Sequence, residues 1–116
     1  MKNIPSLAVA FFLYLTASVV TAAPLVEVNR DSLEISLSPY VDVFEDMDGS
    51  LTIKDMMSAR YASQFAPAAM TELFFGYSTS AYWIKFTVEN QRDESMHFIL
   101  EASPADIDYL DLYVID

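Results

Sequence analysis

The sequence predicts a mostly β fold, an antiparallel β-sandwich of the jelly-roll type with one or two short helices. Several stretches alternate apolar and polar residues with a period of two, which is the pattern of strands with one buried face. The aromatic content is high, with 8 Phe, 7 Tyr and 1 Trp, and aromatic side chains are enriched in strands. Turn-forming sequences rich in Asp, Asn, Ser and Gly separate these stretches.

Three short strands are predicted in the first half of the folded part. Apolar residues alternate with polar ones at residues 26–28 and 33–37. An extended pattern resumes at residues 40–44. Ser38-Pro39 separates the second strand from the third. The stretch from Asp46 to Ser50 then predicts a turn, because Asp and Gly tolerate the backbone angles that tight turns require.

A short helix is predicted to begin at Thr52. Its hydroxyl can accept a free backbone N–H of the first turn, and Asp55 stands where the reciprocal acidic cap belongs. A second helical turn is expected between Arg60 and Phe65, ended by Pro67. The residues from 68 to 75 are expected to form a loop.

The second half predicts three strands, at residues 82–89, 96–102 and 110–114. The first of these places two sets of side chains on opposite faces: Tyr82, Ile84, Phe86 and Val88 on one, and Trp83, Lys85, Thr87 and Glu89 on the other. A jelly roll typically has about eight strands. We therefore expect the sandwich to be incomplete and the sequence to be the front part of a longer protein.

Residues 1–22 have the three parts of a secretory signal peptide. Lys2 provides a positive start, an unbroken apolar run follows over residues 7–15, and small residues lead to Ala22. We expect cleavage after Ala22, which leaves residues 23–116 as the exported domain. An uncleaved membrane anchor is the alternative. A membrane span needs about 20 apolar residues, however, and the apolar run here is shorter.

The exported part is strongly acidic. The whole chain has 6 basic and 17 acidic residues, so removal of Lys2 leaves 5 and 17, a net charge of −12. Such a surface repels nucleic acids and anionic lipid head groups, and no nucleic-acid partner is expected. The chain has no cysteine and one histidine, His97, which together cannot form a zinc site of the ordinary type.

The acidic turn resembles part of a calcium loop without completing it. With Gly49 aligned to the invariant glycine of an EF-hand, Asp46 and Asp48 fall on ligand positions, but Phe44 occupies the first position, where a carboxylate is required. A turn of solvated acids is the favoured interpretation. A looser calcium site at Asp46 and Asp48 stays open as the alternative, because Ca²⁺ tolerates varied oxygen geometry.

The sequence contains no arrangement of residues that meets the usual requirements of a catalytic site, so a non-catalytic protein is predicted. The aromatic residues Tyr77, Tyr82 and Trp83 are the candidate ligand-binding residues, because aromatic faces can stack on sugar rings or enclose cations. For Trp83, packing in the core is the favoured alternative, since large aromatic residues are highly buried on average.

The stretch Gly76-Tyr77-Ser78-Thr79-Ser80-Ala81-Tyr82-Trp83, continuing to Asn90, resembles the type 2 extracellular domain of bacterial seven-transmembrane receptors with diverse intracellular signalling modules. Two further stretches resemble the same family in the same order, at residues 37–55 and 108–114. The resemblance covers roughly Val28 to Asp116.

This resemblance implies a periplasmic β-sandwich similar to carbohydrate-binding modules. It also implies a parent receptor in the inner membrane, with a seven-helix module downstream that this chain does not contain. The function expected from it is non-catalytic sensing of a small extracellular ligand, with carbohydrate as one candidate. A free secreted carbohydrate-binding module is the alternative.

Overall fold

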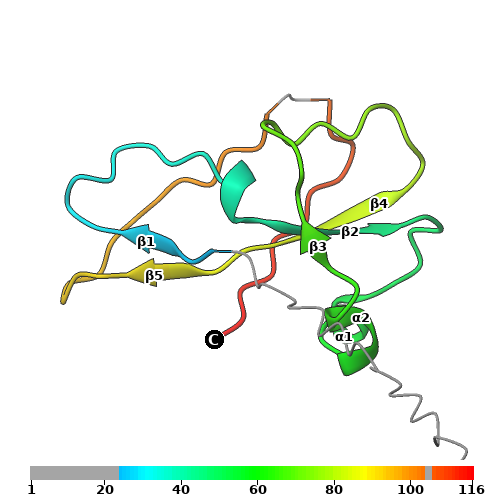
Figure 1. The fold of residues 1–116 in the computed structure, drawn as a ribbon, viewed down its shortest axis with the longest axis horizontal. Coiled ribbons are helices and arrows are strands. Elements are labelled where there is room, and N and C mark those ends of the chain that lie inside the picture. Colours follow the sequence, from blue (N-terminus) through cyan, green and yellow to red (C-terminus); the bar gives the residue numbers. More distant parts are fainter. Residues whose placement is uncertain (1–23, 104–105) are drawn as a thin grey trace, which may run out of the picture.

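The computed structural model describes residues 24–103 and 106–116, so the expected signal peptide over residues 1–22 and its cleavage lie outside the described residues. Figure 1 shows the order of the elements along the chain. They are β1 (Val26–Val28), a 3-10 helix (Ser38–Tyr40), β2 (Asp42–Asp46), α1 (Ile53–Met56), α2 (Ala59–Ala62), β3 (Ala66–Pro67), β4 (Ala81–Lys85) and β5 (Val88–Asn90).

The prediction of a mostly β fold with an antiparallel sheet and short helices is confirmed. Strands β3, β2 and β4 form a three-stranded antiparallel sheet in that order. Strands β1 and β5 form a separate two-stranded sheet, and this pair runs parallel. Among the residues that the structure describes, no helix is long and apolar enough to cross a membrane.

The single strand predicted over residues 82–89 is divided between the two sheets. β4 ends at Lys85 and pairs with β2, whereas β5 begins at Val88 and pairs with β1. Phe86 and Thr87 connect the two strands, and the carbonyl of Thr87 accepts the backbone N–H of Val26 at 2.9 Å. One extended stretch of chain therefore joins both sheets.

Three predicted strands are absent from the described part of the chain, and those predictions were wrong. Residues 33–37, 96–102 and 110–114 carry the alternating pattern but belong to no strand. A strand exists only where a neighbouring strand accepts and donates its backbone hydrogen bonds. Without such a partner the apolar side chains stay exposed, as Leu33 at 97% and Ile99 at 95% show.

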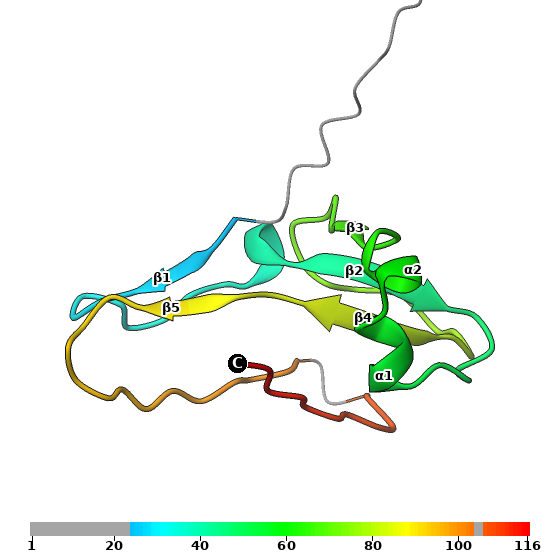
Figure 2. The same ribbon diagram turned by 90° about the horizontal axis from the view of Figure 1, so that it is seen from below.

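The residues after β5 form a layer of their own, here called the C-terminal layer (residues 91–103 and 106–116). Figure 2 shows this layer passing below the strands, outward in orange and back in red. Within the described residues, no backbone–backbone hydrogen bond joins residues 92–103 or 106–116 to the sheets. The layer thus lies where the second sheet of a sandwich would lie, without the hydrogen-bond ladder of a sheet.

The buried apolar core of the described residues is small. It consists of Val26, Val28, Val41 and Met56, each no more than 6% exposed. Val26 and Val28 come from alternate positions of β1, as the sequence pattern predicts, and Met56 comes from the end of α1. The buried apolar residues therefore come from three separate places, which are β1, the position just before β2 and the end of the first helix.

The predicted turn and helix cap after β2 are both confirmed. Gly49 has a φ of 62°, which only glycine adopts without strain, and the buried Asp46 carboxylate accepts the backbone N–H of Leu51 at 2.9 Å. The hydroxyl of Thr52 accepts the N–H of Asp55 at 3.4 Å, and the Asp55 carboxylate accepts the N–H of Thr52 at 2.8 Å. This is a complete capping box.

Replacing Thr52 by Ala is expected to lower the free energy of unfolding at neutral pH by about 1 kcal/mol, because the cap loses its side-chain acceptor. The backbone N–H of Thr52, and then its hydroxyl, hold the pKa of Asp55 below its ordinary value of 3.8. Because the pKa of Asp55 is lower in the folded chain, ionised Asp55 stabilises the fold at pH values above its ordinary pKa. This contribution is lost as the pH falls through the pKa of the folded state. Urea denaturation at pH 7 and at pH 3 measures both effects.

The difference in urea midpoint between wild type and Thr52→Ala should be smaller at acid pH, where the Asp55 carboxylate is protonated. The exposed neighbour Ser50 provides the control, because Ser50→Ala should leave the urea midpoint almost unchanged. Equal midpoints for the Thr52 and Ser50 variants would contradict a stabilising role of the capping box.

Candidate functional site

The pairing of β2 with β4 sorts the candidate residues onto two faces of one sheet. Phe44 lies opposite Trp83, and Glu45 lies opposite Tyr82. Adjacent residues of a strand point to opposite faces. The sheet therefore has a Trp83 face, with Asp42, Phe44, Trp83 and Lys85, and a Tyr82 face, with Val43, Glu45, Tyr82 and Ile84.

The Tyr82 face carries an aromatic stack beside a carboxylate. The ring of Phe75 lies on that of Tyr82, with centroids 4.1 Å apart and an angle of 11° between the planes. One carboxylate oxygen of Glu45 accepts hydrogen bonds from the hydroxyls of Ser80, at 2.8 Å, and Tyr82, at 3.3 Å. Tyr77, in the loop before β4, is 99% exposed.

The Trp83 face is packed more heavily with aromatic rings. Phe44 contacts Tyr61 of α2 and Phe65, with centroid distances of 5.9 and 5.8 Å. Trp83 stacks on Tyr113 of the C-terminal layer at 5.9 Å. This contact joins β4 to the C-terminal layer, and the Trp83 side chain is partly buried.

The same face holds a buried ionisable group. Asp42 is only 7% exposed, and one of its carboxylate oxygens lies 4.0 Å from Nζ of Lys85. The Lys85 ammonium also lies 4.6 Å from the centroid of the Phe65 ring, within the range of a cation–π contact. The Lys85 side chain is half-exposed, so the pair reaches from the interior of the face to solvent.

Two buried polar atoms on the Trp83 face lack hydrogen-bond partners among the described residues. They are Oδ1 of Asp42 and Nε1 of Trp83. A buried polar group without a partner destabilises a fold by about 1–3 kcal/mol, and native structures contain few of them. This face therefore holds one buried acceptor and one buried donor that pair with no other described residue.

The acids proposed for calcium occupy different surroundings. Asp46 is buried at 4% exposure, and its carboxylate already accepts the Leu51 N–H, whereas Asp48 is exposed. Among residues 24–103 and 106–116, no group of three or more His, Cys, Asp or Glu side chains is placed to hold a metal ion. The looser calcium site at Asp46 and Asp48 stays a prediction.

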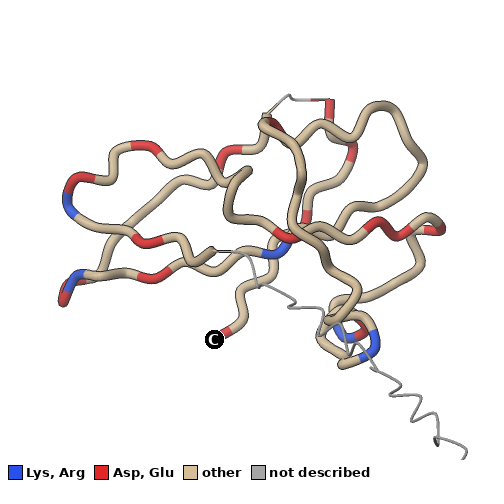
Figure 3. Tube along the Cα trace, in the orientation of Figure 1, with Lys and Arg blue, Asp and Glu red and all other residues tan. Residues whose placement is uncertain are grey.

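Basic side chains are few, and they lie at separate points of the trace. Figure 3 shows red acidic positions spread over most of the chain and blue positions at the left-hand loop tips, near the helices and near the centre of the sheet. The loop tips carry Arg30 and Arg92, and Arg92 pairs with Glu94 at 2.8 Å. Lys85 is thus the one basic residue on β2 or β4.

The sequence pattern pointed to Trp83 but gave no prediction that Asp42 and Lys85 share its face. The signal for Asp42 was present, because its carboxylate stands between two valines in Val41-Asp42-Val43. A charge in such a position is buried only when something compensates it. The predicted ligand-binding role of Tyr77, Tyr82 and Trp83 stays a prediction, and Tyr82 and Trp83 lie on opposite faces.

Comparison with known proteins gives one finding. The family model described as 7TMR-DISM extracellular 2 matches residues 38–116, from the 3-10 helix to the end of the chain. The match includes both faces of the β2–β4 sheet and Tyr113. No curated protein and no solved structure gave a significant match.

Proposed function

The chain belongs to the 7TMR-DISM extracellular 2 family, and on this premise we propose that it is the ligand-sensing domain of a membrane signalling receptor. The family consists of extracellular receptor domains, which implies a location outside the cytoplasm. The proposal adds that this location is the periplasm, that the parent receptor lies in the inner membrane, and that a seven-helix module follows the domain. The domain itself is proposed to be non-catalytic.

The family match over residues 38–116 is the observation that carries this proposal. The structure supports it with a sheet that offers aromatic rings on both faces and unpaired polar atoms on one. Signalling requires only that a ligand binds one state of the receptor more tightly than another. A small extracellular molecule, with carbohydrate as one candidate, would act in this way through Tyr77, Tyr82 or Trp83.

A free secreted carbohydrate-binding module is the second candidate, and the Tyr82 face favours it. The exposed ring of Tyr77 and the stacked pair of Phe75 and Tyr82 are aromatic surfaces of the kind on which sugar rings stack. The two candidates differ in whether the domain is tied to a membrane.

Cell fractionation with an antibody against residues 23–116 separates the two candidates. If the receptor proposal is correct, the antibody should detect a polypeptide much larger than 13.1 kDa in the inner-membrane fraction. The epitope should be accessible in spheroplasts without lysis, whereas a cytoplasmic marker should not be. A soluble periplasmic product no larger than the chain itself would contradict the receptor proposal and favour the free module.

A further inference from the structure

A polar cavity lies where β1 and β5 end. Its volume is about 520 Å³, and residues 29–31 and 91–94 line it. We propose that this cavity binds the zwitterion of a small α-amino acid, with the carboxylate on its arginines and the ammonium on its aspartates. The inference goes beyond the proposed function, because binding here does not depend on whether the domain belongs to a receptor. Residues 29–31 also precede the range of the family match.

The parallel pairing of β1 with β5 brings the two loops of the cavity together. Val28 lies opposite Asn90 at the ends of the strands, and the N–H of Gln91 donates to the carbonyl of Val28 at 3.0 Å. Parallel strands end at the same edge of their sheet, so both loops leave from one place. Figure 3 shows blue beside red at the left-hand tips of the trace, where basic and acidic residues are neighbours.

Each loop begins with an asparagine that fixes its backbone. Oδ1 of Asn29 accepts the N–H of Asp31 at 2.9 Å, and Oδ1 of Asn90 accepts the N–H of Arg92 at 3.0 Å. Nδ2 of Asn90 also donates to the carbonyl of Glu94 at 2.8 Å. Asparagine side chains stabilise turns in this way. The loops are therefore ordered before a ligand arrives, which lowers the cost of binding.

The charges that line the cavity do not all pair with one another. Nη2 of Arg92 lies 2.8 Å from Oε2 of Glu94. Among the described residues, Arg30, Asp31 and Asp93 form no ion pair. A guanidinium has five N–H donors, and Arg92 gives one of them to Glu94. The cavity thus offers one unpaired cation, further donors of a second cation, and two unpaired carboxylates.

This mixture of charges favours a ligand that carries both signs. A simple anion would meet the three carboxylates of the cavity and the acidic surface of the chain, which both repel it. A simple cation would meet Arg30 and Arg92. An α-amino acid carries one carboxylate and one ammonium close together and has no net charge. A guanidinium can bind its carboxylate through two parallel hydrogen bonds. Every lining residue is polar, so a small or polar side chain suits the cavity.

L-Alanine and two of its fragments test the ligand class. The gene product is made at its natural length in its own host with a C-terminal affinity tag, and ligands up to about 10 mM are followed by saturation-transfer NMR. Glycine, L-serine and L-glutamine are tested beside L-alanine, and we expect saturable binding of at least one of the four. Propionate lacks the ammonium of alanine, and ethylamine lacks its carboxylate. Each should bind at least about tenfold more weakly than the tightest amino acid.

Two matched arginine variants locate the carboxylate. Arg30→Gln removes the unpaired cation at an exposed position and should weaken amino-acid binding by about tenfold or more, the loss expected for hydrogen bonds between charged groups. Arg60→Gln makes the same change at an exposed position of α2 and should leave binding within about twofold. Both melting temperatures should stay close to that of wild type, because exposed polar side chains contribute little to stability.

A double variant locates the ammonium. Asp31→Asn with Asp93→Asn removes the two unpaired carboxylates and should weaken amino-acid binding by about tenfold or more. The same variant should bind propionate at least as tightly as wild type does, because two repulsive charges are gone. Discrimination between alanine and propionate should therefore fall, which a general loss of structure would not produce. Asp108→Asn with Asp111→Asn is the control at exposed positions and should preserve the discrimination.

Three results would overturn the proposal. They are the absence of saturable binding by all four amino acids, binding of propionate, ethylamine or inorganic phosphate as tight as that of the amino acids, and a loss in Arg30→Gln no larger than in Arg60→Gln. Each would leave the receptor role intact, since cell fractionation tests that role. A soluble periplasmic product would instead remove the receptor role and leave this site intact, because the NMR experiment measures binding alone.

Discussion

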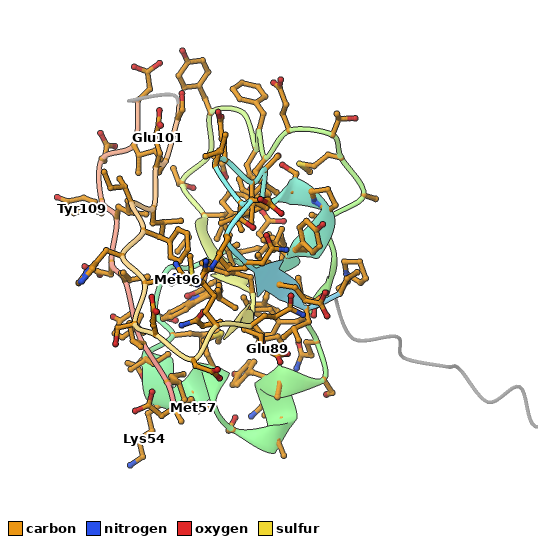
Figure 4. All side chains as sticks on the ribbon, turned by 90° about the vertical axis from the view of Figure 1, so that its left-hand side faces the viewer. Lys54, Met57, Glu89, Met96, Glu101 and Tyr109 are labelled. Atoms are coloured by element: carbon orange, nitrogen blue, oxygen red, sulfur yellow. The ribbon has the colours of Figure 1, made fainter. Side chains whose placement is uncertain are left out.

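Produced alone, the mature chain from Ala23 to Asp116 is expected to form oligomers or aggregates instead of a stable monomer. Large apolar side chains face solvent along most of the C-terminal layer. In this layer the exposed fractions exceed nine-tenths for Ile99 and Tyr109, and Val114 is 83% exposed; Leu33, before β2, is 97% exposed. Figure 4 shows Tyr109 directed away from the sheets. Apolar surface of this extent associates with other chains.

The backbone of the C-terminal layer adds to this tendency. Its described residues 92–103 and 106–116 make no backbone hydrogen bonds to the sheets, so their N–H and C=O groups can pair with another chain. The buried apolar core of four side chains offers little stabilisation to set against association. The chain has no cysteine, so no disulfide compensates.

Size-exclusion chromatography with light scattering tests this expectation. The triple variant Leu33→Lys, Ile99→Lys and Tyr109→Lys should shift the chain toward the monomer, because charges oppose association through apolar surface. A control variant adds the same three charges at exposed polar positions, Thr79, Ser95 and Ser103, and should still associate. A monodisperse wild-type monomer with a sharp cooperative melt would contradict the prediction.

Replacing Met56 by Ala is expected to have the largest effect on stability of any single change in the first helix. Met56 is 6% exposed and is one of the four buried apolar side chains of the described structure. Truncation of a buried Met to Ala lowers the free energy of unfolding by about 2–5 kcal/mol. Small domains have about 5–15 kcal/mol in total, so much or all of the stability would be lost.

The next residue supplies a matched control, because Met57 is 60% exposed. Figure 4 labels this residue at the helical end of the molecule. Met57→Ala should change the free energy of unfolding by less than about 0.5 kcal/mol. Both variants are compared by urea denaturation in the triple-lysine background, which keeps association from obscuring the transition. Similar losses for Met56→Ala and Met57→Ala would show that Met56 is not a core residue.

Features that depend on a few neighbouring residues were predictable from the sequence. The Asp-Gly turn and the capping box between Asp46 and Asp55 are there because turn and cap geometry follows from local side-chain hydrogen bonds and from the freedom of glycine at φ > 0. The alternation that buries Val26 and Val28 was visible for the same reason. The family, too, was recognisable from the residues around Tyr82 and Trp83.

The pairing of strands was not predictable. Alternation with a period of two shows which side chains share a face, but it does not show which strand lies alongside. Residues 82–89 look like one strand, yet the ladder with β2 ends at Lys85 and the ladder with β1 begins at Val88. The stretch from Leu33 to Leu37 alternates over a longer run of residues than β1 and forms no strand. Hydrogen bonds between distant segments decided each case.

The candidate site likewise has one feature that follows from the sequence and others that only the tertiary structure shows. The sequence by itself determined that Tyr82 and Trp83 point to opposite faces, because successive side chains of any strand do so. Only the tertiary structure decided that Asp42 is buried beside Lys85, and that Trp83 lies against Tyr113 with its indole N–H unpaired. The two contacts join residues 43 and 30 positions apart. No local pattern encodes them, because burial is set by whichever segment covers the face.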